Sequence, residues 1–279
     1  MQAECKGVVV TGASRGLGYE LCRAFLRRGD AVVLCSRTEE GAAGAVERLR
    51  AEFGESAAVY GAACDVGKGR EVKSFADFAQ QSLGGTVDVW VNNAGSNAYT
   101  YTKLLEAEDA DLEEIVRTNL LGSMYGAREA ARVMRGQAPV PGHIFMMSGA
   151  GTDGGGTPNF AAYGATKRAL PQLTKSINAE LKGDPGTAHV GVHELSPGMM
   201  TTELLMAGKD VTDVSRFFIN VLAETAEDSA EYLAPRVREV EGRDKAIVYL
   251  TKAKAFRQLL ERLVLKRRKD LWVKEPHQW

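Results

Sequence analysis

The chain has 279 residues, of which 44% are hydrophobic and 25% charged, and this composition suits one large globular α/β domain. The formal net charge of -1 and the sequence pI near 6.5 exclude nucleic acid as an expected partner, because proteins that bind a polyanion carry a basic excess. No apolar run approaches the roughly 18 residues that span a bilayer. We expect no signal or transit peptide in this chain, and this leaves residence in an organelle open.

Short apolar runs alternate with amphipathic helical stretches along most of the chain. The runs predict strands at Val8–Gly12, Ala31–Ser36, Asp88–Gly95, His143–Ser148, His189–Gly198 and Ala246–Leu250, with a further strand ending near Cys64. Continuous apolar strands joined by helices are typical of a parallel sheet covered on both faces. The sequence therefore predicts a doubly wound α/β fold of the Rossmann type, with three layers. We expect one domain over residues 1–250, with a substrate lid at about 199–235, and a basic amphipathic extension over residues 251–279.

The four cysteines form no C-x-x-C pair and lie on expected strands or helices. Cys5, Cys22, Cys35 and Cys64 are therefore expected to be free, buried thiols. We expect neither a disulfide framework nor a metal site.

The first strand and the first helix are joined by the glycine-rich turn TGASRGLG. In a doubly wound fold such a turn places backbone amides and the positive end of a helix dipole against a pyrophosphate. Its spacing, G-x-x-x-G-x-G, differs from the common G-x-G-x-x-G, and the alternative is a plain tight connection. We expect the turn to bind a dinucleotide through Gly12, Ser14, Arg15, Gly16, Leu17 and Gly18.

The end of the second strand carries Ser36 and Arg37, at the place where an NAD-specific enzyme usually has an acid against the ribose. Arg37, beside Arg15, suits the additional 2'-phosphate of NADP, because a guanidinium donates charge-assisted hydrogen bonds to phosphate. We therefore expect NADPH or NADP as the cofactor, the alternative being that Arg37 is merely solvated. Asp65, next to Val66, either contacts the adenine amino group or only caps the following helix.

Tyr163 and Lys167 lie four residues apart in the helical stretch FAAYGATKR, so they share one helix face. A fixed positive charge stabilises a phenolate, and we expect the lysine to lower the pKa of the tyrosine below its usual value of about 10. A phenol of this kind trades protons near neutral pH. Together with a dinucleotide turn, the pair indicates hydride transfer.

These motifs resemble the short-chain dehydrogenase/reductase family over Gly7 to Leu250. The matches are TGASRGLG, the NNAG that ends at Gly95, Asn119 in TNLLG, Ser148, the tyrosine and lysine pair, and Pro197-Gly198 with Thr202. The resemblance implies that Tyr163 is the general acid or base, and that Lys167 lowers its pKa and binds the nicotinamide ribose. It further implies that Ser148 hydrogen-bonds the substrate oxygen and that Asn119 holds a proton-relay water. The implied cofactor contacts also include Asn93, Ala94, Gly95, Tyr163, Lys167, Pro197, Gly198 and Thr202.

The serine departs from the family pattern. Ser148 lies further from Tyr163 than the family's serine usually does, and Ala150 occupies the usual distance. The residues SGAG favour Ser148, with an insertion in the segment TDGGGTP that follows. The alternative is that Ser148 only satisfies backbone groups at a strand end, with Thr152 or Asp153 contacting the substrate.

Several stretches, including NNAGSNAY, SPGMMTTELLM and RFFINVLAE, resemble one branch of the family more particularly. Members of that branch use NADPH in plastids to reduce the C7 formyl group of chlorophyll b or chlorophyllide b to hydroxymethyl, and the resemblance implies this activity. The residues alone indicate less: the apolar side chains after Pro197-Gly198 suit a large apolar ligand or are simply core. They are Leu204, Leu205, Met206, Phe217, Phe218, Ile219, Val221 and Leu222. The alternatives are reduction of another bulky carbonyl, such as a steroid or ketoacyl compound, and a cofactor-binding scaffold in a pigment-breakdown complex.

The residues from Lys252 to Trp279 are basic, and Phe256, Leu259, Leu260 and Leu263 repeat within them at helical spacing. This pattern is typical of a helix on an anionic membrane surface, and the alternative is an extension packed on a neighbouring subunit. We expect peripheral contact with the thylakoid membrane. The family resemblance also implies a homo-oligomer formed through the helices around Asn119 and Tyr163.

Overall fold

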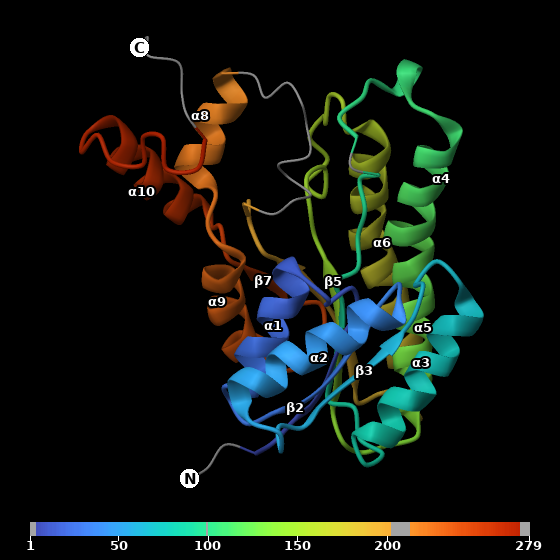
Figure 1. Cartoon of the computed structure of the whole chain (residues 1–279). Coiled ribbons are helices and arrows are strands. Elements are labelled where there is room, and N and C mark those ends of the chain that lie inside the picture. The colour runs from blue at the N-terminus through green and yellow to red at the C-terminus, as the bar shows by residue number, and fades with distance from the viewer. Residues whose placement is uncertain (1–3, 99, 202–212, 274–279) are drawn as a thin grey trace.

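A parallel sheet forms the centre of the structure, a computed structural model that describes residues 4–98, 100–201 and 213–273 (Figure 1). Within these ranges the sheet has seven strands in the order β3-β2-β1-β4-β5-β6-β7. Their bounds are β1 Gly7–Val10, β2 Ala31–Ser36, β3 Val59–Ala63, β4 Val89–Asn92, β5 Gly142–Met147, β6 Val190–Ser196 and β7 Ala246–Val248. The predicted doubly wound fold is confirmed. The strand order reverses between β1 and β4, and in such sheets ligands bind outside the carboxyl ends of the strands at this reversal.

Helices cover both faces of the sheet. One apolar core lies between the sheet and α1, α2 and α9, and the other lies between the sheet and α3, α5 and α6. The helix bounds are α1 Gly16–Leu26, α2 Glu39–Phe53, α3 Gly69–Ser82, α4 Asp109–Val116, α5 Gly122–Arg135, α6 Ala161–Gly183, α8 Asp213–Leu222, α9 Ala226–Arg238 and α10 Lys252–Leu263. A 3-10 turn at Leu104–Glu106 precedes α4, and a π-helical segment at Arg117–Leu121 joins α4 to α5. Among the described residues, none of the helices is both long enough and apolar enough to cross a bilayer.

The burial of the cysteines agrees with the sequence expectation at three positions. Cys22, Cys35 and Cys64 are buried and free, and burial raises the pKa of the Cys22 thiol. Cys5 is free but exposed, so its expected burial is wrong. It lies before β1, outside the sheet.

The C-terminal extension packs against α8 of its own chain (Figure 1). The Asn220 side chain accepts from the backbone N–H groups of Trp272 and Val273 at 2.7 and 3.0 Å and donates to the Val273 carbonyl at 2.7 Å. The Trp272 indole donates to the Ala223 carbonyl at 3.0 Å, so this ring is used for internal packing. The sequence analysis predicted that the extension contacts a membrane or a neighbouring subunit, and it did not predict this contact within the chain.

Glu224 ties the same extension to the turn after β6. Its carboxylate accepts from Gln258 of α10 and lies 3.3 Å from the Arg268 guanidinium. The backbone of Glu224 pairs with Met200, just after Pro197-Gly198. The predicted lid residues 202–212, including Leu204, Leu205 and Met206, lie outside the described residues.

Candidate active site

The glycine turn between β1 and α1 is shaped by close backbone packing. Gly12 has φ +64°, and a Cβ there would lie 2.7 Å from Cα of Ala94. A Cβ on Gly18 would lie 2.5 Å from the Asn93 side-chain nitrogen. Gly16 also has a positive φ, of 60°. Only glycine fits a left-handed conformation with a neighbouring backbone this close, so the turn lies directly against the end of β4.

The amino end of α1 has the features of a phosphate site. Its N-cap residue, Arg15, makes no side-chain capping bond, and its first turn contains no acidic residue. The N-termini of α2, α9 and α10 are capped by threonine side chains, whereas those of α3, α4 and α6 lack a side-chain cap as α1 does; what sets α1 apart is the glycine turn that precedes it. The uncapped N–H groups of α1 and the helix dipole therefore suit a pyrophosphate. Leu17 faces the core, and Ser14 accepts a bond from Arg48 at its carbonyl, 2.7 Å away.

Arg37 extends from the end of β2 toward α4. Its guanidinium lies 3.6 Å from the Glu114 carboxylate, and 64% of its side chain is exposed. Glu114 was not predicted as a neighbour of Arg37, because the two residues lie far apart in the chain. The Ser36 hydroxyl lies close to Gly41, where a Cβ would be 2.5 Å away. Glu114 is the acid that pairs with Arg37, but neither Ser36 nor Thr38, which flank Arg37 in the chain, is acidic, and a guanidinium at the tip of β2 fits a phosphate on the ribose.

Asp65 is used in the local turn before α3. One carboxylate oxygen accepts the Gly67 N–H at 3.0 Å, and the other lies 3.5 Å from the Lys68 ammonium. These bonds stabilise the turn before α3 and do not cap α3 itself, whose N-cap is Lys68, so they match neither predicted role of Asp65, an adenine contact or a helix cap. Val66 is buried against α5, beneath Gly122.

The segment after β4 is bonded to β1. The Asn93 side chain donates to the carbonyls of Thr11 and Gly12 at 2.8 and 3.1 Å. The Thr11 hydroxyl accepts the N–H groups of Asn93 and Ala94, each at 3.1 Å. Thr11 belongs to the predicted turn TGASRGLG, but its contacts with the segment after β4 were not predicted. These hydrogen bonds hold the segment after β4 against the segment after β1, at the point where the strand order reverses.

Asn119 occupies the π-helical segment and is fully buried. Its side chain accepts the Ser96 N–H at 2.7 Å, donates to the Ser96 carbonyl at 2.8 Å and donates to the Thr166 hydroxyl at 3.2 Å. A π-bulge of this kind is frequent at functional sites. A Cβ on Gly95 would lie 3.4 Å from the Asn119 amide oxygen and 3.9 Å from the Lys167 ammonium. The structure thus brings Gly95, Asn119 and Lys167 together.

Tyr163 and Lys167 share one face of α6, as predicted, and both are buried. The Lys167 ammonium lies 5.6 Å from the centre of the Tyr163 ring and donates to the Met147 carbonyl at 2.9 Å. Burial raises the pKa of Tyr163 to about 12 and lowers the pKa of Lys167 to about 8. The expectation that lysine lowers the tyrosine pKa is therefore wrong for this geometry, because burial, which disfavours the phenolate, sets the direction of the shift. The phenol stays protonated at neutral pH and is poised to donate a proton.

Ser148 is not brought to the phenol. Its hydroxyl donates to the Glu194 carboxylate of β6 at 2.7 Å. It lines a cavity of about 400 Å³ with Thr174, Lys245 and other residues, and Tyr163 is not part of that lining. The residue that faces the phenol is Gly149, where a Cβ would lie 2.4 Å from the tyrosine oxygen. Spacing in the sequence did not indicate that Gly149, and not Ser148, would lie against the tyrosine oxygen.

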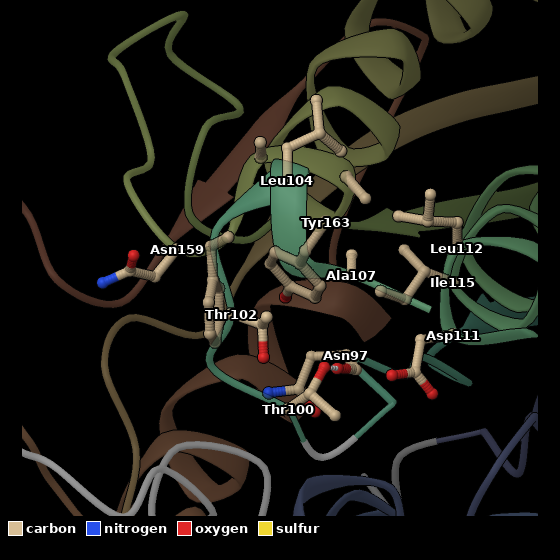
Figure 2. A pocket seen from close by; sticks show the side chains of 13 residues that line it. Asn97, Thr100, Thr102, Leu104, Ala107, Asp111, Leu112, Ile115, Asn159 and Tyr163 are labelled. Carbon is tan, nitrogen blue, oxygen red and sulfur yellow. Dashed lines mark hydrogen bonds between the residues drawn. The ribbon is translucent and has the colours of Figure 1, made fainter. Parts of the chain in front are cut away.

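The phenol borders a separate cleft of about 360 Å³ that opens to solvent (Figure 2). Figure 2 shows Tyr163 among side chains from the segment after β4, from α4 and from the loop before α6. The lining is mixed: Leu104, Leu112 and Ile115 are apolar, whereas Asn97 and Thr102 are polar. A small molecule bound in this cleft would contact Tyr163. Asp153 is exposed and caps its own turn by accepting the Gly155 N–H.

Pro197 and Gly198 follow β6 at the same edge of the sheet. Gly198 has φ +77°, and a Cβ there would lie 2.9 Å from Leu250. The Pro197 carbonyl accepts the Ser229 hydroxyl at 2.9 Å. Thr202, predicted as a cofactor contact, lies outside the described residues.

The fold and these motifs define the class of protein. A family model described as short chain dehydrogenase matches residues 6–211, and the chain belongs to this family of oxidoreductases. Chlorophyll(ide) b reductase NOL, chloroplastic, of Arabidopsis thaliana is 48% identical over 272 residues, which cover 96% of this chain and 76% of that protein. The protein of the same name from Oryza sativa subsp. japonica is 47% identical and covers 96% of this chain and 78% of its own length.

A solved structure with a similar fold is a gluconate 5-dehydrogenase from Burkholderia cenocepacia J2315 in complex with NADP and tartrate. It is 27% identical, has a TM-score of 0.73 and covers 88% of this chain and 95% of that chain.

Proposed function

We propose that this protein reduces the C7 formyl group of chlorophyll b or chlorophyllide b to a hydroxymethyl group with NADPH, in chlorophyll b breakdown in the chloroplast. The observation that carries the proposal is the similarity to chlorophyll(ide) b reductases over 96% of the chain. Tyr163 and Lys167, buried beside a cleft, support it as the acid and the cation of a carbonyl reduction.

The chemistry follows from the state of the phenol. The bound cofactor would supply a hydride to the formyl carbon, and negative charge grows on the formyl oxygen. Tyr163, with its pKa raised to about 12, keeps its proton until that oxygen becomes a stronger base than a phenolate. The Lys167 ammonium stabilises charge near the reacting oxygen. A tyrosine that holds its proton is in the state that reduction starts from, whereas the reverse oxidation starts from the phenolate.

Incubation of the protein with NADPH and chlorophyllide b tests the activity, with absorption spectra and chromatography for the hydroxymethyl product. Tyr163→Phe removes the proton donor, and we expect turnover to fall at least about 1000-fold with NADPH binding unchanged. Turnover of a steroid or ketoacyl compound without turnover of chlorophyllide b supports reduction of another bulky carbonyl. Pigment loss that continues in cells carrying Tyr163→Phe supports the scaffold alternative.

We infer that the cofactor is NADPH. Arg37 at the tip of β2 supports this, since it is exposed and no acid precedes the α2 cap. The α1 N-terminus, which lacks a side-chain cap, supports a bound pyrophosphate. Steady-state kinetics with NADPH and NADH test the preference, and equal catalytic efficiencies overturn it.

We also infer that the extension of residues 251–279 contacts an anionic lipid surface such as the thylakoid membrane. Phe256, Leu260 and Leu263 lie on one side of α10 and are 63%, 43% and 61% exposed. Lys252, Arg257, Lys266, Arg267 and Lys269 are exposed beside them. Exposed apolar side chains flanked by cations are typical of interfacial helices.

Flotation with vesicles that contain or lack anionic lipid tests this contact. We expect Phe256→Ser with Leu263→Ser to abolish binding to anionic vesicles. Leu105→Ser is the matched control, because Leu105 is 98% exposed but lies before α4, outside the extension. Equal binding of both proteins to anionic vesicles overturns the assignment.

We propose a homo-oligomer formed through α4, α5 and α6. Val116, Leu121 and Met124 support it, because these apolar side chains are 41%, 37% and 38% exposed on adjacent turns. Light scattering after gel filtration measures the mass. A monomer at all protein concentrations overturns the proposal, and we expect Met124→Glu to weaken the assembly.

A further inference from the structure

Two residues with hydroxyl groups, Ser148 and Thr152, follow β5, and they differ in their hydrogen-bond acceptors. Ser148 has one O–H, and it donates to Glu194 at 2.7 Å. A substrate carbonyl needs a donor, and a hydroxyl has only one proton to give. A bond to a carboxylate is also stronger than a bond to a neutral carbonyl. The Ser148 proton is therefore committed to Glu194, and Ser148 lines a different cavity from the cleft that Tyr163 lines.

The residue beneath the phenol has no side chain. A Cβ on Gly149 would lie 2.4 Å from the Tyr163 oxygen and 3.2 Å from Cγ of Lys167. A serine at position 149 would collide with the tyrosine. A hydroxyl group beside the phenol must therefore come from a residue other than 149.

Thr152 folds back onto Gly149. Its hydroxyl accepts the Gly149 N–H at 3.0 Å, and its own N–H donates to the Gly149 carbonyl at 3.1 Å. Within the described residues the Thr152 hydroxyl donates to no other group, so its proton is available. Arg168 of α6 donates to the Thr152 carbonyl at 2.9 Å and holds this turn against the helix that carries Tyr163. Gly149 is thus the common neighbour of the phenol and of this threonine.

We propose that Thr152, and not Ser148, is the catalytic hydroxyl that donates a hydrogen bond to the carbonyl oxygen of the substrate. The inference rests on the proposed function and specifies its site. As hydride adds to the formyl carbon, the C–O double bond becomes a single bond and the oxygen takes up negative charge. Thr152 stabilises this oxygen without losing its proton, and Tyr163 supplies the proton that completes the alcohol. Ser148 and Glu194 form a structural pair between β5 and β6.

Three variants separate the two hydroxyls: Thr152→Val, Thr152→Ser and Ser148→Ala. We expect Thr152→Val to lower kcat about 100-fold, the usual effect of removing one donor to a developing oxyanion. Thr152→Ser keeps the O–H and should stay within about threefold of the wild type. Ser148→Ala should keep at least about a third of kcat but lower the melting temperature, because it leaves Glu194 without its donor. NADPH affinity and the melting temperature are measured for every variant.

The outcomes are exclusive. Loss of kcat in Ser148→Ala with normal kcat in Thr152→Val overturns the inference. A Thr152→Val protein with a lower melting temperature or weaker NADPH binding, but normal kcat, also overturns it, because that pattern indicates only a structural turn. If the wild type does not reduce chlorophyllide b, the proposed function fails separately. The same variants are then compared on 4-nitrobenzaldehyde, and absence of wild-type turnover there overturns the inference as well.

Discussion

The two halves of the site are built differently. The cofactor half, from β1 to the end of β4, is fixed by backbone packing: Gly12 and Gly18 have no room for a side chain. The catalytic half, from β5 onward, is fixed by where side chains point: Ser148 toward Glu194, and Lys167 toward the Met147 carbonyl. A steric requirement for glycine is visible in a sequence as a letter at a fixed spacing. The direction of a side chain at a strand end is not, because a single inserted residue changes it.

The strongest test of this contrast is Gly12→Ala. The alanine would adopt a left-handed conformation with its Cβ 2.7 Å from the Ala94 backbone, so the turn or β4 must move. We expect NADPH affinity to fall by about 100-fold or more, measured by fluorescence titration. Gly29→Ala is the matched control: Gly29 has φ +79° but nothing within 4 Å of its Cβ position. It should lower the free energy of unfolding by about 1–2 kcal/mol and leave NADPH affinity unchanged. Equal affinity losses would contradict the packing argument.

The sequence predicted those parts that depend on local pattern. Apolar runs located the strands, and the spacing of Tyr163 and Lys167 placed both side chains on one face of α6. The pKa of Tyr163 was not predictable, because burial depends on the segments that cover the ring. The neighbours of Arg37 and Asn220 were also hidden, since Glu114 and Trp272 are distant in sequence and meet only in the fold. Long-range side-chain contacts of this kind leave no periodic trace.

The next largest expected effect is a pH dependence of stability, and it comes from a buried histidine pair in the catalytic half. His193 Nδ1 accepts the Lys245 N–H at 3.3 Å, and His193 Nε2 lies 3.0 Å from His143 Nδ1. Burial lowers the pKa of His143 to about 4 and of His193 to about 3, and the Lys6 and Lys245 charges act in the same direction. Unfolded histidine has a pKa near 6.5. The stabilisation is therefore complete above about pH 6.5 and is lost as the pH falls toward 4.

Because of this pair, we expect the free energy of unfolding to fall by about 2 kcal/mol when the pH is lowered from 7.5 to 5.5, measured by urea unfolding. His193→Gln has no proton to take up and should show a shallower pH dependence. His189→Gln is the control, because His189 is partly exposed and bonds the Met134 carbonyl at 2.8 Å. A His193→Gln slope as steep as that of the wild type would contradict the assignment.

The smallest expected effect is the loss of catalytic efficiency with NADPH when Arg37 is replaced. At this position the cofactor half depends on a side chain and not on a glycine. Arg37→Ala removes charge-assisted donors to the 2'-phosphate, and we expect catalytic efficiency with NADPH to fall about tenfold while NADH is unaffected. Arg117→Ala is the matched control: Arg117 is 54% exposed and pairs with Glu113 in the same way. Glu114 competes with the phosphate for Arg37, 3.6 Å away, so Glu114→Gln should strengthen NADPH binding about twofold. An Arg37→Ala protein that loses NADPH and NADH efficiency equally would show that this cation supports the fold of the edge and not the choice of cofactor.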